Sequence, residues 1–363
     1  MTESTALNPT APTGSTPAPA LGYPFASPPL PGQTLEVAPG VHWIRMPLPF
    51  SLDHINLWAL EDGEGWALVD TGVCNEITLD TWRTLFSTLL QGRPVTRVFV
   101  THMHPDHIGL AGWLTRHFGA RLWMTRLEYL HCRALVSDTG RPAPAEGLAF
   151  YRRAGWGDTA LEGYQTRFGN FGKVIHALPD SYRRIQQGEA VQIGGRRWEI
   201  WVGAGHSPEH ACLYCPEQGL FISGDQVLPR ISSNVSVYPV EPEANPMAEW
   251  NDSLARLRRD IPDDVLVLPS HNDCFRGLHT RITQLQSGQD KAMERLRRSL
   301  REPRRAVDVF GALFARPITE AQHSLISLAT GESLACLNYL VHTGEAVCEA
   351  DAQGVDWYRL RAG

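Results

Sequence analysis

Residues 101–109 read Thr-His-Met-His-Pro-Asp-His-Ile-Gly and follow directly on the apolar run Val98–Val100. Four side chains that can bind a metal, three imidazoles and one carboxylate, fall within six residues at the end of a predicted strand. Imidazole nitrogen and carboxylate oxygen suit zinc, and manganese or iron can replace it. The spacing lets His102 and His104 face one position while Asp106 and His107 face another. The stretch therefore predicts two adjacent metal sites.

A cluster of four ligands cannot complete two metal sites, so further ligands are expected at the ends of other strands. The sequence contains four more apolar runs that end in a residue able to bind or orient a metal. In chain order these residues are Asp70 after 67–69, His206 after 199–205, Asp225 after 220–224 and His271 after 265–270. We predict that the fold brings them to the 101–109 stretch.

The order of these motifs resembles the five-motif pattern of the metallo-β-lactamase superfamily over about residues 34–276. The resemblance implies an α/β (α+β) fold, a four-layer αββα sandwich with two metals at one edge of its sheets. It implies a ligand division of His102, His104 and His206 on one metal, Asp106, His107 and His271 on the other, and Asp225 bridging. Asp70 would orient ligands without binding a metal itself. The expected cofactors are two Zn²⁺ ions, with Mn²⁺ or Fe²⁺ as substitutes.

The composition is that of a globular protein with a large core, because 43% of the 363 residues are hydrophobic and 20% are charged. The formal net charge of −6 argues against a basic surface for nucleic acid or an anionic membrane. No apolar run is long enough to span a membrane, and the N-terminus lacks a signal-peptide pattern. We therefore expect a cytoplasmic protein with a small-molecule substrate and no membrane partner. Nucleic acid and a homodimer through the C-terminal domain stay open as alternatives.

The chain divides into several predicted parts. Residues 1–33 are rich in Pro, Ala and Thr, a composition that predicts a disordered tail. Residues 34–276 form the metallo-β-lactamase domain, with a helical insertion near 128–184 that is either a substrate lid or an extra outer layer. Residues 277–302 form a connecting helix, and 303–363 a winged-helix-like domain. This combination resembles the β-lactamase-like protein 2 branch and its bacterial relatives, a branch whose animal members are described as endoribonucleases.

Within the C-terminal domain, the apolar pattern predicts helices over 307–314, 319–327 and 333–343 and a hairpin over 346–358. The third helix carries no Lys or Arg, which makes it a poor reader of DNA. The predicted connecting helix ends in a group of arginines. They are Arg295, Arg297, Arg298, Arg301, Arg304 and Arg305. This group is either an RNA-backbone patch or a solvated helix end whose cations complement the helix dipole.

Four residues near the predicted metals are weaker candidates for substrate contact. They are His54, His210, Asn234 and Tyr238. His54 ends a loop that would border the site, His210 lies four residues beyond His206, and the other two follow the bridging aspartate. For each of them a structural role is the alternative.

The chemistry expected of two adjacent metals is hydrolysis. Two metals lower the pKa of a shared water toward neutral, so a metal-bridging hydroxide can attack a carbonyl carbon or a phosphorus. Asp106 would orient this hydroxide and Asp70 would orient the metal ligands. These two are therefore the predicted catalytic residues. The acidic chain favours a small ester, thioester or lactone as substrate. The alternative is an endoribonuclease or phosphodiesterase, while a β-lactamase or a non-catalytic effector fits less well.

Overall fold

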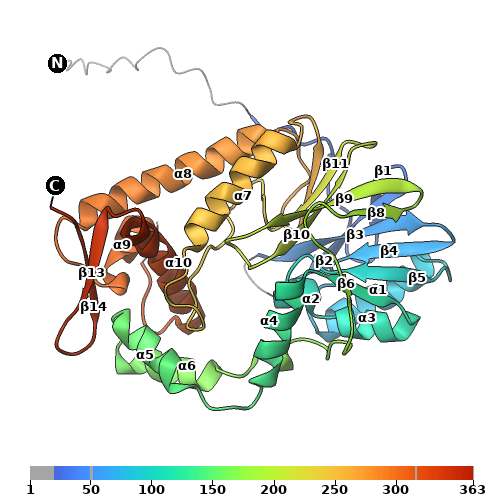
Figure 1. The fold of residues 1–363 in the computed structure, drawn as a ribbon. Coiled ribbons are helices and arrows are strands. Elements are labelled where there is room, and N and C mark those ends of the chain that lie inside the picture. The colour runs from blue at the N-terminus through green and yellow to red at the C-terminus, as the bar shows by residue number, and fades with distance from the viewer. Residues whose placement is uncertain (1–19, 50–51, 315–316, 363) are drawn as a thin grey trace, which may run out of the picture.

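The molecule, a computed structural model that describes residues 20–49, 52–314 and 317–362, is built around two β-sheets that lie face to face. Helices cover the outer face of each sheet (Figure 1), which gives the αββα sandwich that the sequence predicts. Within the described residues, the first sheet has seven strands in the order of the chain, and the second has five in the order β12-β11-β10-β9-β8.

The first sheet is antiparallel up to β4 and parallel from β4 onward. Its strands are β1 (Thr34–Ala38), β2 (Val41–Pro47), β3 (His54–Asp62), β4 (Gly65–Val69), β5 (Val95–Phe99), β6 (Arg121–Met124) and β7 (Arg183–Arg184). In the second sheet only the β11–β12 pair is parallel among the described strands. Its strands are β8 (Ala190–Ile193), β9 (Arg196–Gly203), β10 (His210–Cys215), β11 (Leu220–Gly224) and β12 (Leu266–Pro269).

The core between the two sheets consists of large apolar side chains from alternating strand positions. Trp43, Trp58 and Phe99 of the first sheet are buried together with Trp198 and Ile222 of the second. Apolar burial of this kind is the main force that holds two sheets together, at about 25 cal/mol per Å² removed from water.

Helices cover the outer faces with separate apolar clusters. On the first sheet these are α1 (Glu76–Thr88), α2 (Pro105–Ile108) and α3 (Ala111–Phe118). On the second they are α7 (Pro246–Asp260) and α8 (Leu278–Ser299). The N-terminus of α1 is capped by the Asn75 side chain, which accepts a hydrogen bond from the backbone N–H of Thr78 at 2.8 Å.

The insertion contains α4 (Arg126–Ser137), α5 (Ala145–Arg153), α6 (Asp158–Arg167) and the short 3₁₀ helix η1 (Phe171–Lys173). Figure 1 shows α4 beside the sandwich and α5 with α6 beneath the C-terminal helices. The Nε1 of Trp156, between α5 and α6, donates to the hydroxyl of Thr330 at 2.8 Å. The insertion therefore contacts both the sandwich and the C-terminal domain, and its role as a substrate lid or an extra outer layer stays a prediction.

The C-terminal domain differs from the expected three helices. It contains η2 (Ala306–Val309), α9 (Phe310–Leu313), α10 (His323–His342) and the hairpin β13 (Ala346–Ala350) with β14 (Asp356–Leu360). Residues 319–327 and 333–343 were predicted as separate helices, but α10 runs through the gap between them. The reason is Gly331, where an added Cβ would lie 2.8 Å from the Oγ of Ser236, so the glycine permits close packing and does not end the helix. The hairpin is present, and the winged-helix assignment stays a prediction.

The predicted disorder of residues 1–33 is wrong for the part that the structure describes, which begins at residue 20. Gly22 and Arg276 exchange backbone hydrogen bonds of 3.2 and 2.8 Å. The Phe25 ring packs against Trp43 with 6.2 Å between centroids. These aromatic contacts offset the entropy cost of ordering a Pro-rich segment. Residues 1–19 lie outside the described residues.

The arginine group at the end of α8 is partly neutralised by its own domain. Arg297 forms an ion pair with Glu345 at 2.6 Å, and Arg305 forms one with Asp308 at 2.8 Å. The Nε of Arg295 donates to a backbone carbonyl of α9 at 2.7 Å. These contacts favour the solvated helix end over a continuous phosphate-binding surface. No helix in the described part of the chain is long and apolar enough to cross a membrane.

Candidate metal centre

The predicted ligands lie at one edge of the sandwich because their strands end there. β4 and β5 are parallel neighbours, and so are β11 and β12. Parallel strands present their carboxyl ends at the same edge. Asp70 and the 101–109 stretch follow the first pair, and Asp225 and His271 follow the second. His206 follows β9 in the second sheet.

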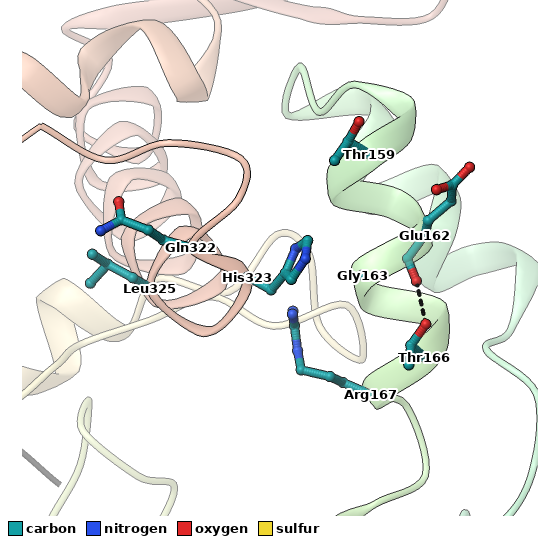
Figure 2. Close-up of a pocket in the computed structure, with 8 residues that line it drawn as sticks. All are labelled: Thr159, Glu162, Gly163, Thr166, Arg167, Gln322, His323 and Leu325. Carbon is teal, nitrogen blue, oxygen red and sulfur yellow. Dashed lines mark hydrogen bonds between the residues drawn. The ribbon is translucent and has the colours of Figure 1, made fainter.

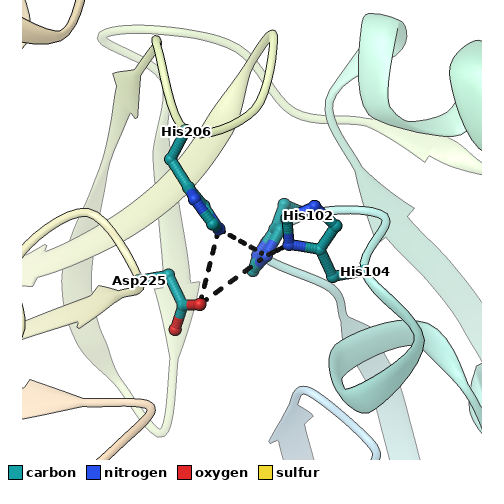
Figure 3. A group of neighbouring side chains, drawn as sticks. All are labelled: His102, His104, His206 and Asp225. Carbon is teal, nitrogen blue, oxygen red and sulfur yellow. Dashed lines mark hydrogen bonds and ion pairs between the residues drawn. The ribbon is translucent and has the colours of Figure 1, made fainter. Parts of the chain in front are cut away.

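His102, His104, His206 and Asp225 form the first ligand group (Figure 3). The Nε2 of His102 lies 2.8 Å from the Nδ1 of His104 and 3.3 Å from the Nε2 of His206. The Oδ2 of Asp225 lies 3.4 Å from the Nε2 of His206. Figure 3 shows these side chains pointing toward a common centre. The structure thus brings together the ligands predicted for one metal.

Asp106, His107 and His271 form the second ligand group. The Oδ2 of Asp106 lies 3.4 Å from the Nε2 of His271 and 3.6 Å from the Nε2 of His107. His107 and His271 are buried, while Asp106 keeps 22% of its side chain exposed. This exposure leaves the carboxylate open to a small molecule that enters the site.

Asp225 lies between the two groups. Its Oδ2 faces the first group, and its Oδ1 lies 3.6 Å from the Nε2 of His107 and 3.5 Å from the Nε2 of His271. The two oxygens of one carboxylate therefore face different sets of imidazoles. This is the arrangement that a bridging ligand requires.

The donor set fits divalent cations. Ligand nitrogens about 2.0–2.1 Å from a tetrahedral zinc lie roughly 3.3 Å apart, and the Nε2 atoms of His102 and His206 are 3.3 Å apart. Among the described residues, the buried Nε2 of His107 and the buried Oδ1 of Asp225 have no hydrogen-bond partner. Buried polar atoms without a partner are costly, and a cation between them would satisfy both.

A second layer of contacts fixes the imidazole rings. Each of four ligand histidines has its Nδ1 within hydrogen-bond distance of an oxygen atom. The pairs are His102 with the Thr101 hydroxyl at 3.0 Å, His107 with Asp70 at 2.8 Å, His206 with the Asn234 carbonyl at 2.7 Å and His271 with the His54 carbonyl at 2.9 Å. Such contacts direct Nε2 toward the centre and set the orientation of each ring.

Asp70 has a tightly constrained place beside the second group. Its Oδ1 accepts a hydrogen bond from the backbone N–H of Thr101 at 2.8 Å, while its Oδ2 accepts from the Nδ1 of His107. Its backbone has a φ of +62°, a left-handed conformation that is uncommon for residues other than glycine. The side chain is buried and holds the metal loop to β4, which is a supporting position and not a ligand position.

Burial lowers the pKa of two histidines of the first group, His102 and His104. Desolvation, with a smaller contribution from His107, lowers the pKa of His102 well below its ordinary value. Desolvation together with His206 lowers the pKa of His104 to about 3. Because a metal binds the neutral form of imidazole, these histidines are available as ligands without losing a proton.

The second group differs because carboxylates surround it. Desolvation alone would lower the pKa of His271, but the carboxylates of Asp225 and Asp106 outweigh it and raise this pKa to about 10. Desolvation likewise opposes the ionised form of Asp106, yet His107 and His271 lower the pKa of this carboxyl to about 2. The carboxylates therefore favour positive charge at the histidines of this group, and a bound cation would supply that charge.

Two of the weaker candidates for substrate contact have structural partners. His210 is fully buried, and its Nε2 accepts a hydrogen bond from the backbone N–H of Asp225 at 3.0 Å. His54 lies 2.6 Å from Asp53 through Nδ1 and accepts from the backbone N–H of Asn272 through Nε2 at 2.8 Å. Both rings contact the ligand loops, which favours the structural role for these two histidines, and their contact with substrate stays a prediction.

Asn234 links the metal centre to the C-terminal domain. Its carbonyl accepts the hydrogen bond from His206, and its side-chain amide donates to the Oε2 of Glu332 in α10 at 2.8 Å. Tyr238, four residues later, is 37% exposed. Tyr238 thus keeps access to solvent, while the Asn234 side chain is directed toward α10.

Sequence reasoning missed one buried residue that joins two ligand loops. Glu128 of α4 accepts hydrogen bonds from the backbone N–H of Met103 at 2.9 Å and from that of Glu209 at 2.8 Å. Desolvation raises its pKa above the ordinary value. The only signal in the sequence was a carboxylate early in a predicted helical segment, and that signal does not reveal its distant partners.

Family models match most of the chain. A model of the metallo-beta-lactamase superfamily matches residues 51–271, and a model of the metallo-beta-lactamase-like C-terminal domain matches residues 293–361. The predicted domain boundaries at 34–276 and 303–363 overlap these matches and stay predictions.

Solved structures agree with the family models. The crystal structure of a beta-lactamase domain protein from Burkholderia ambifaria is 43% identical, with a TM-score of 0.85 over 94% of this chain and 98% of that one. A metallo-beta-lactamase family protein from Thermus thermophilus is 25% identical, with a TM-score of 0.75 over 90% of this chain and 100% of that one.

A curated relative is an atrochrysone carboxyl ACP thioesterase from Aspergillus fumigatus, 22% identical over 262 residues. That match covers 70% of this chain but only 47% of the thioesterase, so the chain aligns with about half of that protein. The family match over residues 51–271 and the Burkholderia structure show that this chain belongs to the metallo-beta-lactamase superfamily of metal-dependent hydrolases.

Proposed function

We propose that the protein is a dinuclear metal-dependent hydrolase of small carbonyl substrates, namely esters, thioesters or lactones. The observation that supports this proposal best is Asp225, whose two oxygens face different ligand groups at 3.4–3.6 Å. A carboxylate in this position would hold two cations side by side. Zn²⁺ is the favoured ion because the donors are imidazoles and carboxylates, and Mn²⁺ or Fe²⁺ are substitutes.

The chain's own residues have distinct roles in this reaction. When bound, two divalent cations would lower the pKa of a water between them and polarise the carbonyl under attack. His102, His104 and His206 would hold one cation, and Asp106, His107 and His271 the other. Asp106, partly exposed, would also accept a hydrogen bond from the attacking water and orient it. Asp70 would hold the His107 ring through the hydrogen bond to its Nδ1, on the side opposite the Nε2 that faces the cation.

Two observations favour a carbonyl substrate over a phosphodiester. The net charge is −6, and two arginines of the α8 group are paired with carboxylates of their own domain. Recognition of a phosphate backbone depends on several free cations. The similarity to a thioesterase also favours a carbonyl substrate. Among the proposed substrates it supports a thioester.

The proposal is tested with a substrate panel on protein loaded with zinc. The panel contains an acyl thioester, a lactone, a bis-aryl phosphodiester and single-stranded RNA. We expect turnover of the carbonyl substrates, loss of turnover after chelation, and recovery when zinc is restored. Turnover confined to RNA or the phosphodiester would overturn the proposed substrate class. It would indicate that the exposed arginines at the end of α8 bind the substrate.

A further inference from the structure

A cavity of about 660 Å³ lies between α6 and the start of α10 (Figure 2). Figure 2 shows Arg167 of α6 and His323 of α10 between the two helices. No residue that lines this cavity contacts a predicted metal ligand in the described part of the chain. The cavity therefore belongs to the packing of the insertion against the C-terminal domain. A group of residues from the first sheet, by contrast, reaches the ligand His271 and its neighbours directly.

The residue that follows His271 has a strained backbone. Asn272 has a φ of +66°, a left-handed conformation that is uncommon for residues other than glycine, although asparagine adopts it more readily than most. A residue in such a conformation persists where the surrounding contacts hold it in place. The contacts that hold Asn272 therefore also set the position of the ligand before it.

Both polar backbone groups of Asn272 are bound by side chains of β2 and β3. Its N–H donates to the Nε2 of His54 at 2.8 Å. Its carbonyl accepts from the Nδ2 of Asn56 at 2.8 Å and from the Nη2 of Arg45 at 2.8 Å. Asn272 follows β12 of the second sheet, whereas its three partners lie in strands of the first. The first sheet thus holds a ligand loop of the second.

Asn56 contacts the loop on both sides of His271. Its Nδ2 donates to the carbonyl of Pro269 at 2.9 Å as well as to that of Asn272. Its backbone N–H donates to the carbonyl of Ser270 at 2.7 Å. The side chain is fully buried, and the two bonds use both hydrogens of its amide nitrogen. Asn56 therefore binds the backbone before and after the ligand.

Arg45 keeps the Asn56 amide in this orientation. The two residues are opposite each other in the pairing of β2 with β3, and the Arg45 Nε donates to the Asn56 Oδ1 at 3.2 Å. An amide oxygen accepts hydrogen bonds and an amide nitrogen donates them, so the oxygen faces the guanidinium and the nitrogen faces the loop. Asp273 compensates the Arg45 charge, with 3.3 Å between Nη2 and Oδ1. The network thus directs both Asn56 donors at the ligand loop.

We propose that Asn56 is a positioning residue for the second cation of the dinuclear centre. This rests on the proposed function, because it concerns the ion that Asp106, His107 and His271 would bind. The Nδ1 of His271 lies 2.9 Å from the carbonyl of His54, so β3 also fixes the ring. A shift of the loop backbone moves the Nε2 of His271 relative to the Asp106 carboxylate, from which it lies 3.4 Å. Contacts that orient a ligand change metal affinity by about ten- to a hundredfold.

The test compares the full-length wild type with Asn56→Asp, a nearly isosteric change that removes both donors. Asn338→Asp is the matched control, because the Asn338 Nδ2 also donates to two backbone carbonyls, those of Pro242 at 3.0 Å and Ala244 at 2.9 Å. Neither of these carbonyls belongs to a neighbour of a metal ligand in the sequence.

Each protein is titrated with Co²⁺ in place of Zn²⁺, because the visible spectrum of Co²⁺ reports the geometry of each site as it fills. We expect two binding steps with equal dissociation constants in wild type and Asn338→Asp. In Asn56→Asp one step should weaken by about ten- to a hundredfold while the other stays unchanged. Equal binding of both ions by all three proteins would overturn the proposal.

A second substitution distinguishes positioning of the ligand from a general loss of structure. Asn272→Gly lets the backbone adopt its left-handed conformation without strain, so the loop depends less on the Asn56 donors. Asn272→Gly added to Asn56→Asp should therefore restore part of the lost Co²⁺ affinity. A loss in Asn56→Asp with no recovery in the double variant would indicate a general loss of structure and would also overturn the proposal.

Hydrogen–deuterium exchange of the metal-free proteins separates this inference from the proposed function. If the wild type does not bind two ions, the proposed function fails, and the exchange of residues 266–274 still tests the contacts of Asn56. We expect faster exchange of this segment in Asn56→Asp than in wild type and Asn338→Asp. Equal exchange in the three proteins would refute the positioning role, because the loop would then be held without the Asn56 donors.

Discussion

The carboxylate of Asp70 and the imidazole of His107 form a buried hydrogen bond, with 2.8 Å between Oδ2 and Nδ1. The bond connects the end of β4 to the loop after β5. It leaves the Nε2 of His107 facing Asp106 and Asp225. The orientation of this ligand is therefore set by a residue that does not itself face the centre.

Asp70→Ala should weaken zinc binding by about ten- to a hundredfold, because His107 loses the contact that fixes its ring. Metal content is measured after dialysis against a series of zinc buffers. The loss should concern one of two ions, since the first ligand group has other partners. Unchanged zinc affinity would show that the Thr101 hydroxyl, 3.2 Å from the same Nδ1, suffices to hold the ring.

Glu332→Ala should weaken zinc binding although this residue lies in the C-terminal domain. The substitution removes the acceptor for the Asn234 amide and frees the carbonyl that holds His206. Glu332→Gln should retain part of the affinity because its amide oxygen can still accept. Glu349→Ala, which removes an exposed carboxylate of the same domain, is the control. Equal affinities in all four proteins would show that the loop around Asn234 keeps its shape without α10.

Glu128→Ala should destabilise the metal-free protein. The backbone N–H groups of Met103, which is buried, and of Glu209, which is partly buried, would lose their acceptor. A buried N–H without a partner lowers the unfolding free energy by about 1–3 kcal/mol. Urea unfolding measures the change. Glu302→Ala, at an exposed position, should have no comparable effect. A loss below 0.5 kcal/mol, roughly that of an ordinary surface substitution, would contradict the importance of these two bonds.

The ion pair between Arg297 and Glu345 should make the free energy of unfolding depend on pH in the acid range. The Arg297 guanidinium lowers the pKa of Glu345 below its ordinary value of 4.5. A lowered pKa in the folded state means that the contribution is complete above pH 4.5 and is lost as pH falls through the folded-state pKa. Both side chains are more than a third exposed, so solvent screens the pair and we expect about 0.2–1 kcal/mol. Urea midpoints of wild type and Glu345→Gln should differ at pH 7 and converge near pH 3; a constant difference would contradict the assignment.

The sequence predicted which candidate ligands gather at one edge because each of them stands at a position that is recognisable locally. His206, Asp225 and His271 stand at the ends of apolar runs, and a strand end is a local feature. Parallel pairing then brings distant strand ends to one edge. The chemistry of the side chains and the order of the motifs were enough to predict which side chains lie together at this edge.

Contacts across the fold were not predictable in the same way. His210 and Glu128 have roles that depend on which backbone N–H groups they meet, and these partners belong to other strands and loops. Gly331 lies between the two helices predicted over 319–327 and 333–343, but its close packing against Ser236 is part of one continuous helix, α10.

The most direct test of the account is the metal content of wild type and Asp225→Ala, measured by elemental analysis of protein purified without chelator and reconstituted with zinc. We expect two ions per chain in the wild type, matching the two ligand groups. We expect one ion or fewer, and no hydrolysis, in Asp225→Ala. A wild type that binds no metal, or a variant with unchanged content and rate, would contradict the dinuclear centre.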